Sequence, residues 1–261
     1  MSDLRISEGK FPSKDGLELF GRDVLPPDGS AIRAHVAVVH GYSDHLGRYS
    51  AFLEHLARSG LAAHAFDYRG HGRAQGRRGH CDAFTQFHDD LDAFLARVRP
   101  RLEGRKLFLF AHSHGVLVVL SWALARGSDG VARAAFSAPF LRLAFQPPRV
   151  KLWAARVLER IAPGFHLGNE LQVSQLSRDP EWQKLTAADP LYGHVTTPRW
   201  FAQAVAAQAE VLRRAGELRF PCLLMHGSAD PIADPAATRE LHATLGSADK
   251  TLTTYDGFLH E

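Results

Sequence analysis

Short apolar runs alternate along this chain with stretches in which apolar residues recur at helical spacing. The runs are rich in β-branched and aromatic residues, as strands are, and they cover 17–24, 35–40, 61–67, 106–110, 131–136, 220–225 and 250–255. Helical spacing marks 49–59, 114–125 and 235–245, and a further helix that Asp82 can cap. This alternation predicts an α/β protein with a mostly parallel, doubly wound sheet.

The alternation stops between Pro139 and Glu217, where helix-like stretches occur without a strand pattern. We therefore expect a core in two parts, 1–138 and 218–261, with 139–217 inserted between them as a helical cap. A last strand at 250–255 needs cover on both faces in a doubly wound sheet. We accordingly expect a C-terminal helix beyond Glu261, which this sequence does not contain.

Composition narrows the class of protein. The 261 residues are 45% hydrophobic and 23% charged, enough to bury a sizeable core. A net charge of +3, without a basic run interleaved with aromatic residues, argues against a nucleic-acid partner. The two cysteines have no framework spacing, the first ten residues are polar, and no long uncharged apolar stretch occurs. These features predict a cytoplasmic protein with reduced thiols and no membrane span.

The run at 106–110 leads into Ala111-His112-Ser113-His114-Gly115, and an apolar helix follows. This segment differs by one residue from Gly-x-Ser-x-Gly, the nucleophile elbow, where small neighbours let the serine sit on a sharp strand-to-helix turn. Ala111 adds only a methyl group to the usual glycine. By themselves the five residues also fit a serine in an ordinary turn, so the rest of the chain has to decide.

Asp230 and His260 follow the strands expected at 220–225 and 250–255, so the order along the chain is Ser113, Asp230, His260. A serine hydroxyl needs an imidazole to take its proton, and the imidazole needs a carboxylate to hold its tautomer. We therefore predict a catalytic triad of these three residues. Asp234 is a second candidate for the acid, but it stands at the expected start of the helix 235–245 and is interpreted as its cap.

From His40 to His260 the chain resembles the monoacylglycerol lipase and lysophospholipase group of α/β-hydrolase serine esterases. The motifs that carry the resemblance are His40-Gly41-Tyr42, Gly47-Arg48-Tyr49, Asp67-Tyr68-Arg69-Gly70-His71-Gly72, the segment around Ser113, Asp189-Pro190-Leu191 and Gly227-Ser228-Ala229-Asp230. The resemblance implies an α/β-hydrolase fold and hydrolysis of single-chain lipid esters, such as monoacylglycerol or lysophospholipid, without a cofactor.

The resemblance also implies that the backbone N–H groups of Tyr42 and His114 form the oxyanion hole. Four further residues are expected to support the loop that carries Tyr42, the oxyanion loop, namely His40, Gly41, Asp44 and Arg48. The chain departs from the family in having His114 where a methionine usually follows the serine, and Val116 where a second glycine usually stands.

Alternatives to this interpretation concern metal binding and substrate. His112 and His114 flank the serine, but neighbours of an elbow serine point apart and no carboxylate nearby completes a ligand set, so we expect no metal. A peptidase or thioesterase on the same scaffold, and a hydrolase-like binding protein without turnover, stay open as alternatives. The sequence leaves the oligomeric state open.

Within the expected cap, one helical face of 150–161 is apolar. Its apolar residues are Val150, Trp153, Ala154, Val157, Leu158 and Ile161, and its basic neighbours are Arg149, Lys151, Arg156 and Arg160. Such a face either packs on the core domain or lies on lipid. The second interpretation predicts transient contact of the cap with a membrane or micelle.

Overall fold

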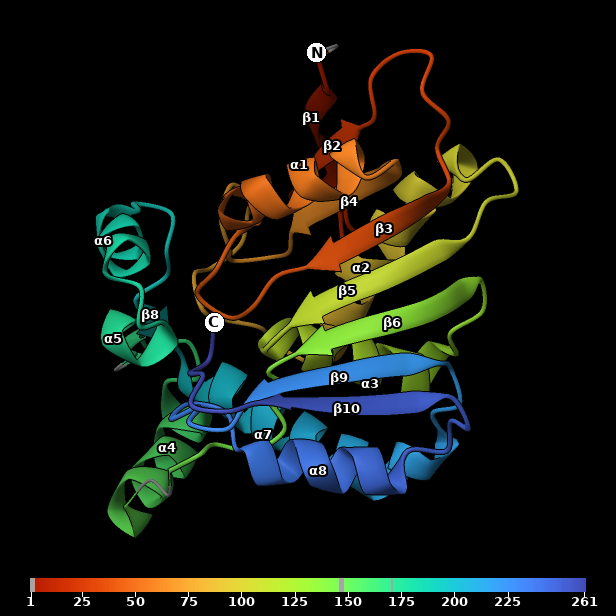
Figure 1. Cartoon of the computed structure of the whole chain (residues 1–261). Helices are drawn as coiled ribbons and strands as arrows, with labels where there is room; N and C mark the ends of the chain where they lie inside the picture. Colours follow the sequence, from red (N-terminus) through yellow and green to blue (C-terminus); the bar gives the residue numbers. More distant parts are fainter. Residues whose placement is uncertain (1–2, 146–147, 170) are drawn as a thin grey trace.

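An eight-stranded sheet forms the centre of the protein (Figure 1). The computed structural model describes residues 3–145, 148–169 and 171–261, without the side chains of residues 149, 151 and 152. The strand order is β1-β2-β4-β3-β5-β6-β9-β10. The strands are β1 Arg5–Pro12, β2 Glu18–Leu25, β3 Ala34–Val39, β4 Leu61–Asp67, β5 Leu107–His112, β6 Val131–Ser137, β9 Cys222–Gly227 and β10 Lys250–Tyr255.

From β4 to β10 every neighbouring pair is parallel, whereas β1 and β2 add an antiparallel edge. The predicted doubly wound sheet is therefore confirmed. All six residues of β3 are buried. Val36 and Val38 pack into a cluster with α1 (Ser50–Arg58), and Ala37 and Val39 pack into a larger cluster with α2 (Thr85–Val98) and α3 (His114–Arg126). Alternate side chains thus contact helices on opposite faces of the sheet.

Two details differ from the sequence-based expectation. Strand β1 was not expected, because six of its eight residues are exposed and it carries no apolar alternation. Its pairing with β2 defines it instead. The helix expected after Asp82 begins only at Thr85, and Asp82 does not cap it; the Asp82 backbone N–H instead bonds the side chain of Gln86 at 2.8 Å.

The described residues of 139–217 form four α-helices and contribute no strand to the main sheet. Their elements are α4 Arg149–Ile161, β7 Leu167–Gly168, α5 Val173–Leu176, α6 Pro180–Ala188, β8 Val195–Thr196 and α7 Pro198–Arg214. Strands β7 and β8 pair over two residues each, too short a ladder to leave a sequence pattern. Figure 1 shows α4, α5 and α6 beyond the carboxyl ends of the parallel strands. Helix α7 instead packs on α3.

The remaining elements of the described fold are the single-turn helices η1 Leu46–Tyr49, η2 Arg99–Arg101 and η3 Ala215–Glu217, and the longer helix α8 Pro235–Thr244. Helix α8 follows β9 and packs on β9 and β10. Across the described part of the chain, no helix has the length and apolarity needed to cross a bilayer.

Candidate active site

Ser113 stands at the sharp turn between β5 and α3. Its backbone has φ 52° and ψ −117°, a strained conformation for a residue with a side chain. Two hydrogen bonds hold the turn: the Ser113 N–H donates to Ser137 O at 2.9 Å, and the Phe140 N–H donates to Ser113 O at 3.2 Å. This geometry is that of a nucleophile elbow, with the side chain presented at the strand's carboxyl end.

Small neighbours permit the turn, as the sequence indicated. A Cβ on Gly115 would come within 2.4 Å of the His40 carbonyl oxygen, so α3 starts closer to the end of β3 than any other residue would allow. Ala111, in place of the usual glycine, is fully buried and its methyl group joins the larger hydrophobic cluster. The alanine is therefore compatible with the elbow.

The structure brings the three predicted triad side chains together, in the predicted order. The Ser113 hydroxyl oxygen lies 2.9 Å from His260 Nε2, and His260 Nδ1 lies 2.7 Å from Asp230 Oδ2. All three residues are buried. An imidazole in this arrangement can accept the serine proton at Nε2 while its Nδ1–H donates to the carboxylate.

Asp230 is held as an anion by the donors around it. Its Oδ1 accepts from the N–H groups of Ile232 at 2.8 Å and Ala233 at 3.0 Å, and its Oδ2 lies 2.9 Å from His226 Nε2. Burial favours the neutral acid, but hydrogen bonds from His226 and His260 outweigh it and hold the pKa of Asp230 well below its usual range.

His226 was not among the residues singled out from the sequence. It lies in the same strand-end segment as Asp230, where a histidine four residues before the acid was the available signal. Asp234, the rival acid, caps α8 by accepting the Ala236 N–H at 2.8 Å and pairs with Arg142 at 2.9 Å. Its interpretation as a helix cap is confirmed.

Two backbone N–H groups stand free beside the serine. In the part of the chain that the structure describes, the N–H groups of Tyr42 and His114 have no protein acceptor. Gly41 approaches the serine so closely that a Cβ on it would lie 3.3 Å from Ser113 Cβ. Free N–H groups beside a nucleophile, one of them at the start of a helix, can bind the anionic oxygen of a tetrahedral intermediate.

The histidines that flank Ser113 have separate partners. His112 Nδ1 lies 3.3 Å from the Ser137 hydroxyl, whereas the His114 ring contacts Tyr68 and Trp200. Burial lowers the pKa of both histidines well below the usual value, so both rings are neutral. No group of three or more histidine, cysteine, aspartate or glutamate side chains suited to a metal ion occurs among the described residues.

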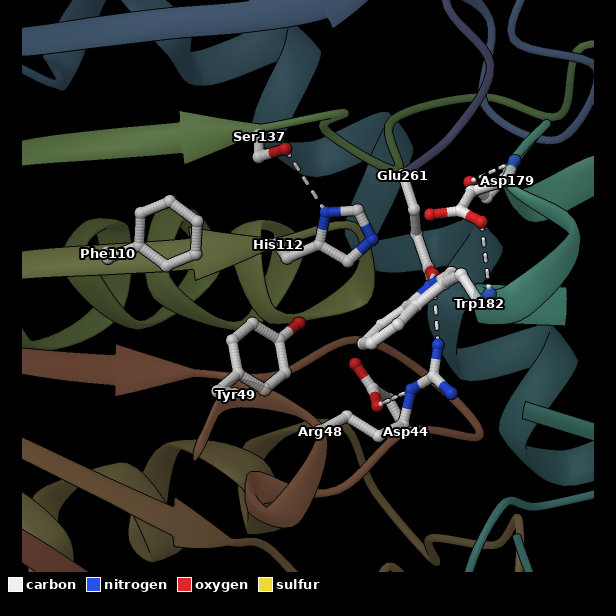
Figure 2. Close-up of a pocket in the computed structure, with 10 residues that line it drawn as sticks. Asp44, Arg48, Tyr49, Phe110, His112, Ser137, Asp179, Trp182 and Glu261 are labelled. Carbon is white, nitrogen blue, oxygen red and sulfur yellow. Dashed lines mark hydrogen bonds and ion pairs between the residues drawn. The ribbon is translucent and has the colours of Figure 1, made fainter. Parts of the chain in front are cut away.

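Arg48 ties the loop that carries Tyr42 to α6 (Figure 2). The Arg48 guanidinium lies 2.9 Å from Asp44 Oδ1 and 2.9 Å from Glu261 Oε2, donates to the Thr186 hydroxyl at 2.6 Å, and lies over the Trp182 ring at 4.6 Å. Thr186 and Trp182 belong to α6, and Glu261 follows His260. Arg48 therefore connects the loop, α6 and the segment that holds His260.

A cavity of about 400 Å³ lies beside this ion pair, between Arg48 and His112 (Figure 2). None of the three triad residues lines it. Burial and the nearby charge of Glu261 raise the pKa of Asp44 to about 6, although Arg48 opposes the shift. The ion pair between Asp44 and Arg48 is thus buried and costly to break.

Comparisons with known proteins identify relatives of this chain. The profile of a family described as "Serine aminopeptidase, S33" matches residues 30–261. A monoacylglycerol lipase of Mycolicibacterium smegmatis is 32% identical over 98% of this chain and 90% of its own length. A monoglyceride lipase of Rattus norvegicus is 31% identical over 94% of this chain and 80% of its own length.

Solved structures show the same similarity. The crystal structure of a Paleococcus ferrophilus monoacylglycerol lipase matches with a TM-score of 0.81 and 30% identity, covering 98% of this chain and 91% of the other. A monoglyceride lipase variant from Saccharomyces cerevisiae matches with a TM-score of 0.83 at 21% identity, which supports the fold alone. The chain therefore belongs to this family of α/β-hydrolases, and it is a serine hydrolase of carboxylic esters.

Proposed function

We propose that the chain hydrolyses carboxylic esters of single-chain lipids, of the monoacylglycerol or lysophospholipid type. The observation that carries the proposal is the contact chain from Ser113 through His260 to Asp230, with distances of 2.9 and 2.7 Å. The lipase names of relatives that align over nearly the whole chain support the substrate class.

In the proposed mechanism the Ser113 oxygen attacks the ester carbonyl while its proton passes to His260 Nε2. Asp230 stabilises the resulting imidazolium and keeps its Nδ1–H in place, and the N–H groups of Tyr42 and His114 bind the anionic oxygen. His260 then protonates the departing alcohol. Water, deprotonated by the same histidine, releases the fatty acid and restores the serine.

The test compares the parent with Ser113→Ala. The variant should lose labelling by a fluorophosphonate probe and several orders of magnitude of ester hydrolysis, because the three residues act as a unit. Ser128→Ala, which removes a hydroxyl in the turn before β6, is the control and should behave as the parent. Turnover by Ser113→Ala within tenfold of the parent would refute the assignment.

Peptide or thioester cleavage is the alternative that the family description raises. A panel of monoacylglycerols, lysophospholipids, aminoacyl p-nitroanilides and acyl thioesters separates these activities by kcat/KM. We expect the lipid esters to be the best substrates. Faster cleavage of the anilides or thioesters than of every lipid ester would contradict the proposed substrate class.

We further propose that α4 contacts the surface of a membrane or micelle. Val150, Trp153 and Ile161 lie on one face of α4 and are 69%, 66% and 73% exposed, as an interfacial helix requires. Arg156 and Arg160 are exposed beside them. The side chains of Arg149 and Lys151, the other two basic residues of the prediction, lie outside the described residues.

The lipid contact is tested with the triple variant Val150→Ser, Trp153→Ser, Val157→Ser. It should lose turnover of micellar monoacylglycerol far more than turnover of p-nitrophenyl acetate, because only the aggregated substrate requires docking. Arg239→Ser, on α8 in the core domain, serves as the control. Equal losses on both substrates would mean that the face of α4 has no role in docking.

The domain division stays part of the proposal: a core of 1–138 and 218–261 with 139–217 as the cap. In support, 139–217 adds no described strand to the main sheet, and α7 joins it to the core by packing on α3. A cytoplasmic location is likewise proposed. The free, buried thiols of Cys81 and Cys222 are compatible with a reducing compartment.

A further inference from the structure

Beneath the serine turn, the His114 side chain belongs to a buried chain of hydrogen bonds that the mechanism above does not use. His114 is fully buried, and Tyr68 and Trp200 are nearly so. Trp200 Nε1 lies 3.3 Å from His114 Nε2, and His114 Nδ1 lies 3.2 Å from the Tyr68 hydroxyl. That hydroxyl lies 2.7 Å from the carbonyl oxygen of Gly41.

The chemistry of the groups fixes the direction of each bond. An indole N–H can only donate, so His114 Nε2 accepts from Trp200. The neutral ring then carries its proton on Nδ1 and donates it to the Tyr68 oxygen. The Tyr68 proton is left to donate to the Gly41 carbonyl, because a carbonyl oxygen can only accept. His40 Nδ1, 2.7 Å from the same oxygen, is a second donor to it.

The Gly41 carbonyl belongs to the same planar peptide unit as the Tyr42 N–H. A donor that anchors the carbonyl oxygen therefore also fixes the direction of the N–H on the other side of the plane. Hydrogen bonding at the oxygen further polarises the unit and strengthens its N–H as a donor. Both effects act on one of the two N–H groups assigned above to the oxyanion.

The second of those N–H groups belongs to His114 itself, whose ring is bonded to Tyr68. We propose that Tyr68 and the His114 side chain are positioning residues that hold the two oxyanion donors in one fixed arrangement. The inference rests on the proposed function, because it assigns these N–H groups to the oxyanion of the reaction at Ser113.

Trp200 extends this arrangement to α7. Its indole donates to His114 and also stacks on the Tyr42 ring, with centroids 3.7 Å apart. The Tyr42 hydroxyl donates to the carbonyl of Val195, which lies in β8 shortly before α7. The oxyanion loop and the serine turn are therefore both bonded to the chain segment that starts α7, so that segment takes part in setting the donor geometry.

The primary test is Tyr68→Phe, which removes only a hydroxyl group. Complete loss of an oxyanion donor costs about 10²–10³ in kcat. Because Tyr68→Phe leaves the N–H present but less well fixed, we expect kcat for a soluble p-nitrophenyl ester to fall about 10–100-fold with KM within about threefold. Tyr255→Phe, the same chemical change at the half-exposed end of β10, should leave both constants unchanged.

A transition-state analogue separates positioning from a general structural effect. An alkyl trifluoromethyl ketone adds to Ser113: the serine oxygen bonds to the ketone carbon, the serine proton passes to His260, and the ketone oxygen becomes the bound oxyanion. Its inhibition constant should rise by the factor by which kcat/KM falls. The inhibition constant of a non-reactive alkylglycerol ether, which forms no oxyanion, should not change.

His114→Met provides a second, independent variant, because it keeps the backbone N–H and a similar apolar volume. It should lower kcat in the same range. The double variant Tyr68→Phe/His114→Met should lose about as much as Tyr68→Phe alone, since both remove links of one chain. Trp200→Phe, which keeps a ring on Tyr42 and loses only the indole N–H, should show a smaller loss of kcat.

Three results would overturn the inference: kcat of Tyr68→Phe within twofold of the parent, an equal weakening of the ether and the ketone, or losses that multiply in the double variant. Fluorophosphonate titration of each variant counts the folded sites, so rates refer to intact enzyme. A parent that fails to react with the probe refutes the proposed function instead. An active, labelled parent with an unaffected Tyr68→Phe refutes only the positioning role.

Discussion

Asp230→Asn tests the triad through a single change of charge with little change of shape. In the parent, Asp230 Oδ2 accepts from His260 Nδ1 at 2.7 Å, while Oδ1 accepts the N–H groups of Ile232 and Ala233. The asparagine oxygen should keep those two backbone bonds, which leaves its NH₂ group facing His260. A donor at this place favours the histidine tautomer with its proton on Nε2, which cannot accept the Ser113 proton.

The expected loss follows from this tautomer change. The equivalent aspartate-to-asparagine substitution in the triad of a serine protease lowers kcat about 10⁴-fold, and such a factor corresponds to about 5.4 kcal/mol of transition-state stabilisation. We expect a loss of the same order here. The assay is kcat/KM for p-nitrophenyl butyrate at pH 7.5, with circular dichroism to check the fold.

Asp234→Asn is the matched control for this variant. Asp234 caps α8 through the Ala236 N–H, and asparagine caps as well as aspartate, so neither activity nor stability should change greatly. Activity of Asp230→Asn within tenfold of the parent, or an equal loss in Asp234→Asn, would refute the assignment of the acid.

Three further predictions concern stability. Burial lowers the pKa of His71 and His88 to about 4, below the unfolded value of about 6.5. Between these values the unfolded chain binds protons that the native chain does not, so Tm should fall as pH decreases from 7 to 5. A Tm that stays constant over this range in scanning calorimetry would contradict the prediction. Gly115→Ala should lower the free energy of unfolding in urea by about 1–3 kcal/mol, because the new Cβ would lie 2.4 Å from the His40 carbonyl oxygen. Gly9→Ala is the control and should leave this free energy unchanged, because the space around Gly9 is open. Arg48→Met should lower the free energy of unfolding by about 3–5 kcal/mol, because it leaves the buried Asp44 carboxylate without its cation. The double variant Arg48→Met/Asp44→Asn should recover part of this loss of stability. If it recovers none, the ion pair is not the cause of the loss.

The central strands were predictable because burial on both faces makes them continuously apolar, as in β3. Strand β1 was not predictable, since an edge strand with six exposed residues is defined by hydrogen bonds to its neighbour and not by side-chain pattern. The same limit applies to β7 and β8, whose two-residue ladder joins segments far apart in the chain. Tertiary pairing, not local preference, makes these strands.

The placement of Ser113, Asp230 and His260 was predictable, because parallel strands bring their carboxyl ends to one edge of the sheet. The groups that we propose to position the oxyanion donors were harder to foresee. Trp200 contacts His114 across 86 residues of sequence, and nothing in the local pattern of α7 distinguishes it from an ordinary core tryptophan. Its role depends on how closely α7 packs on α3.

Neutral groups beneath the serine suit the chemistry proposed for it. Burial lowers the pKa values of His40, His71 and His114, so these rings act as dipoles and carry no charge near the oxyanion site. A carboxylate there would oppose a developing negative charge, and a cation would also attract the Asp230 carboxylate and compete with His260. Fixed dipoles in a poorly hydrated site can stabilise the oxyanion without reorganising during the reaction. The charged groups of Asp44, Arg48 and Glu261 instead contact one another in a separate cluster. In the proposed mechanism the carboxylate of Asp230 acts on the reaction, because its partner His260 becomes positive when it accepts the serine proton.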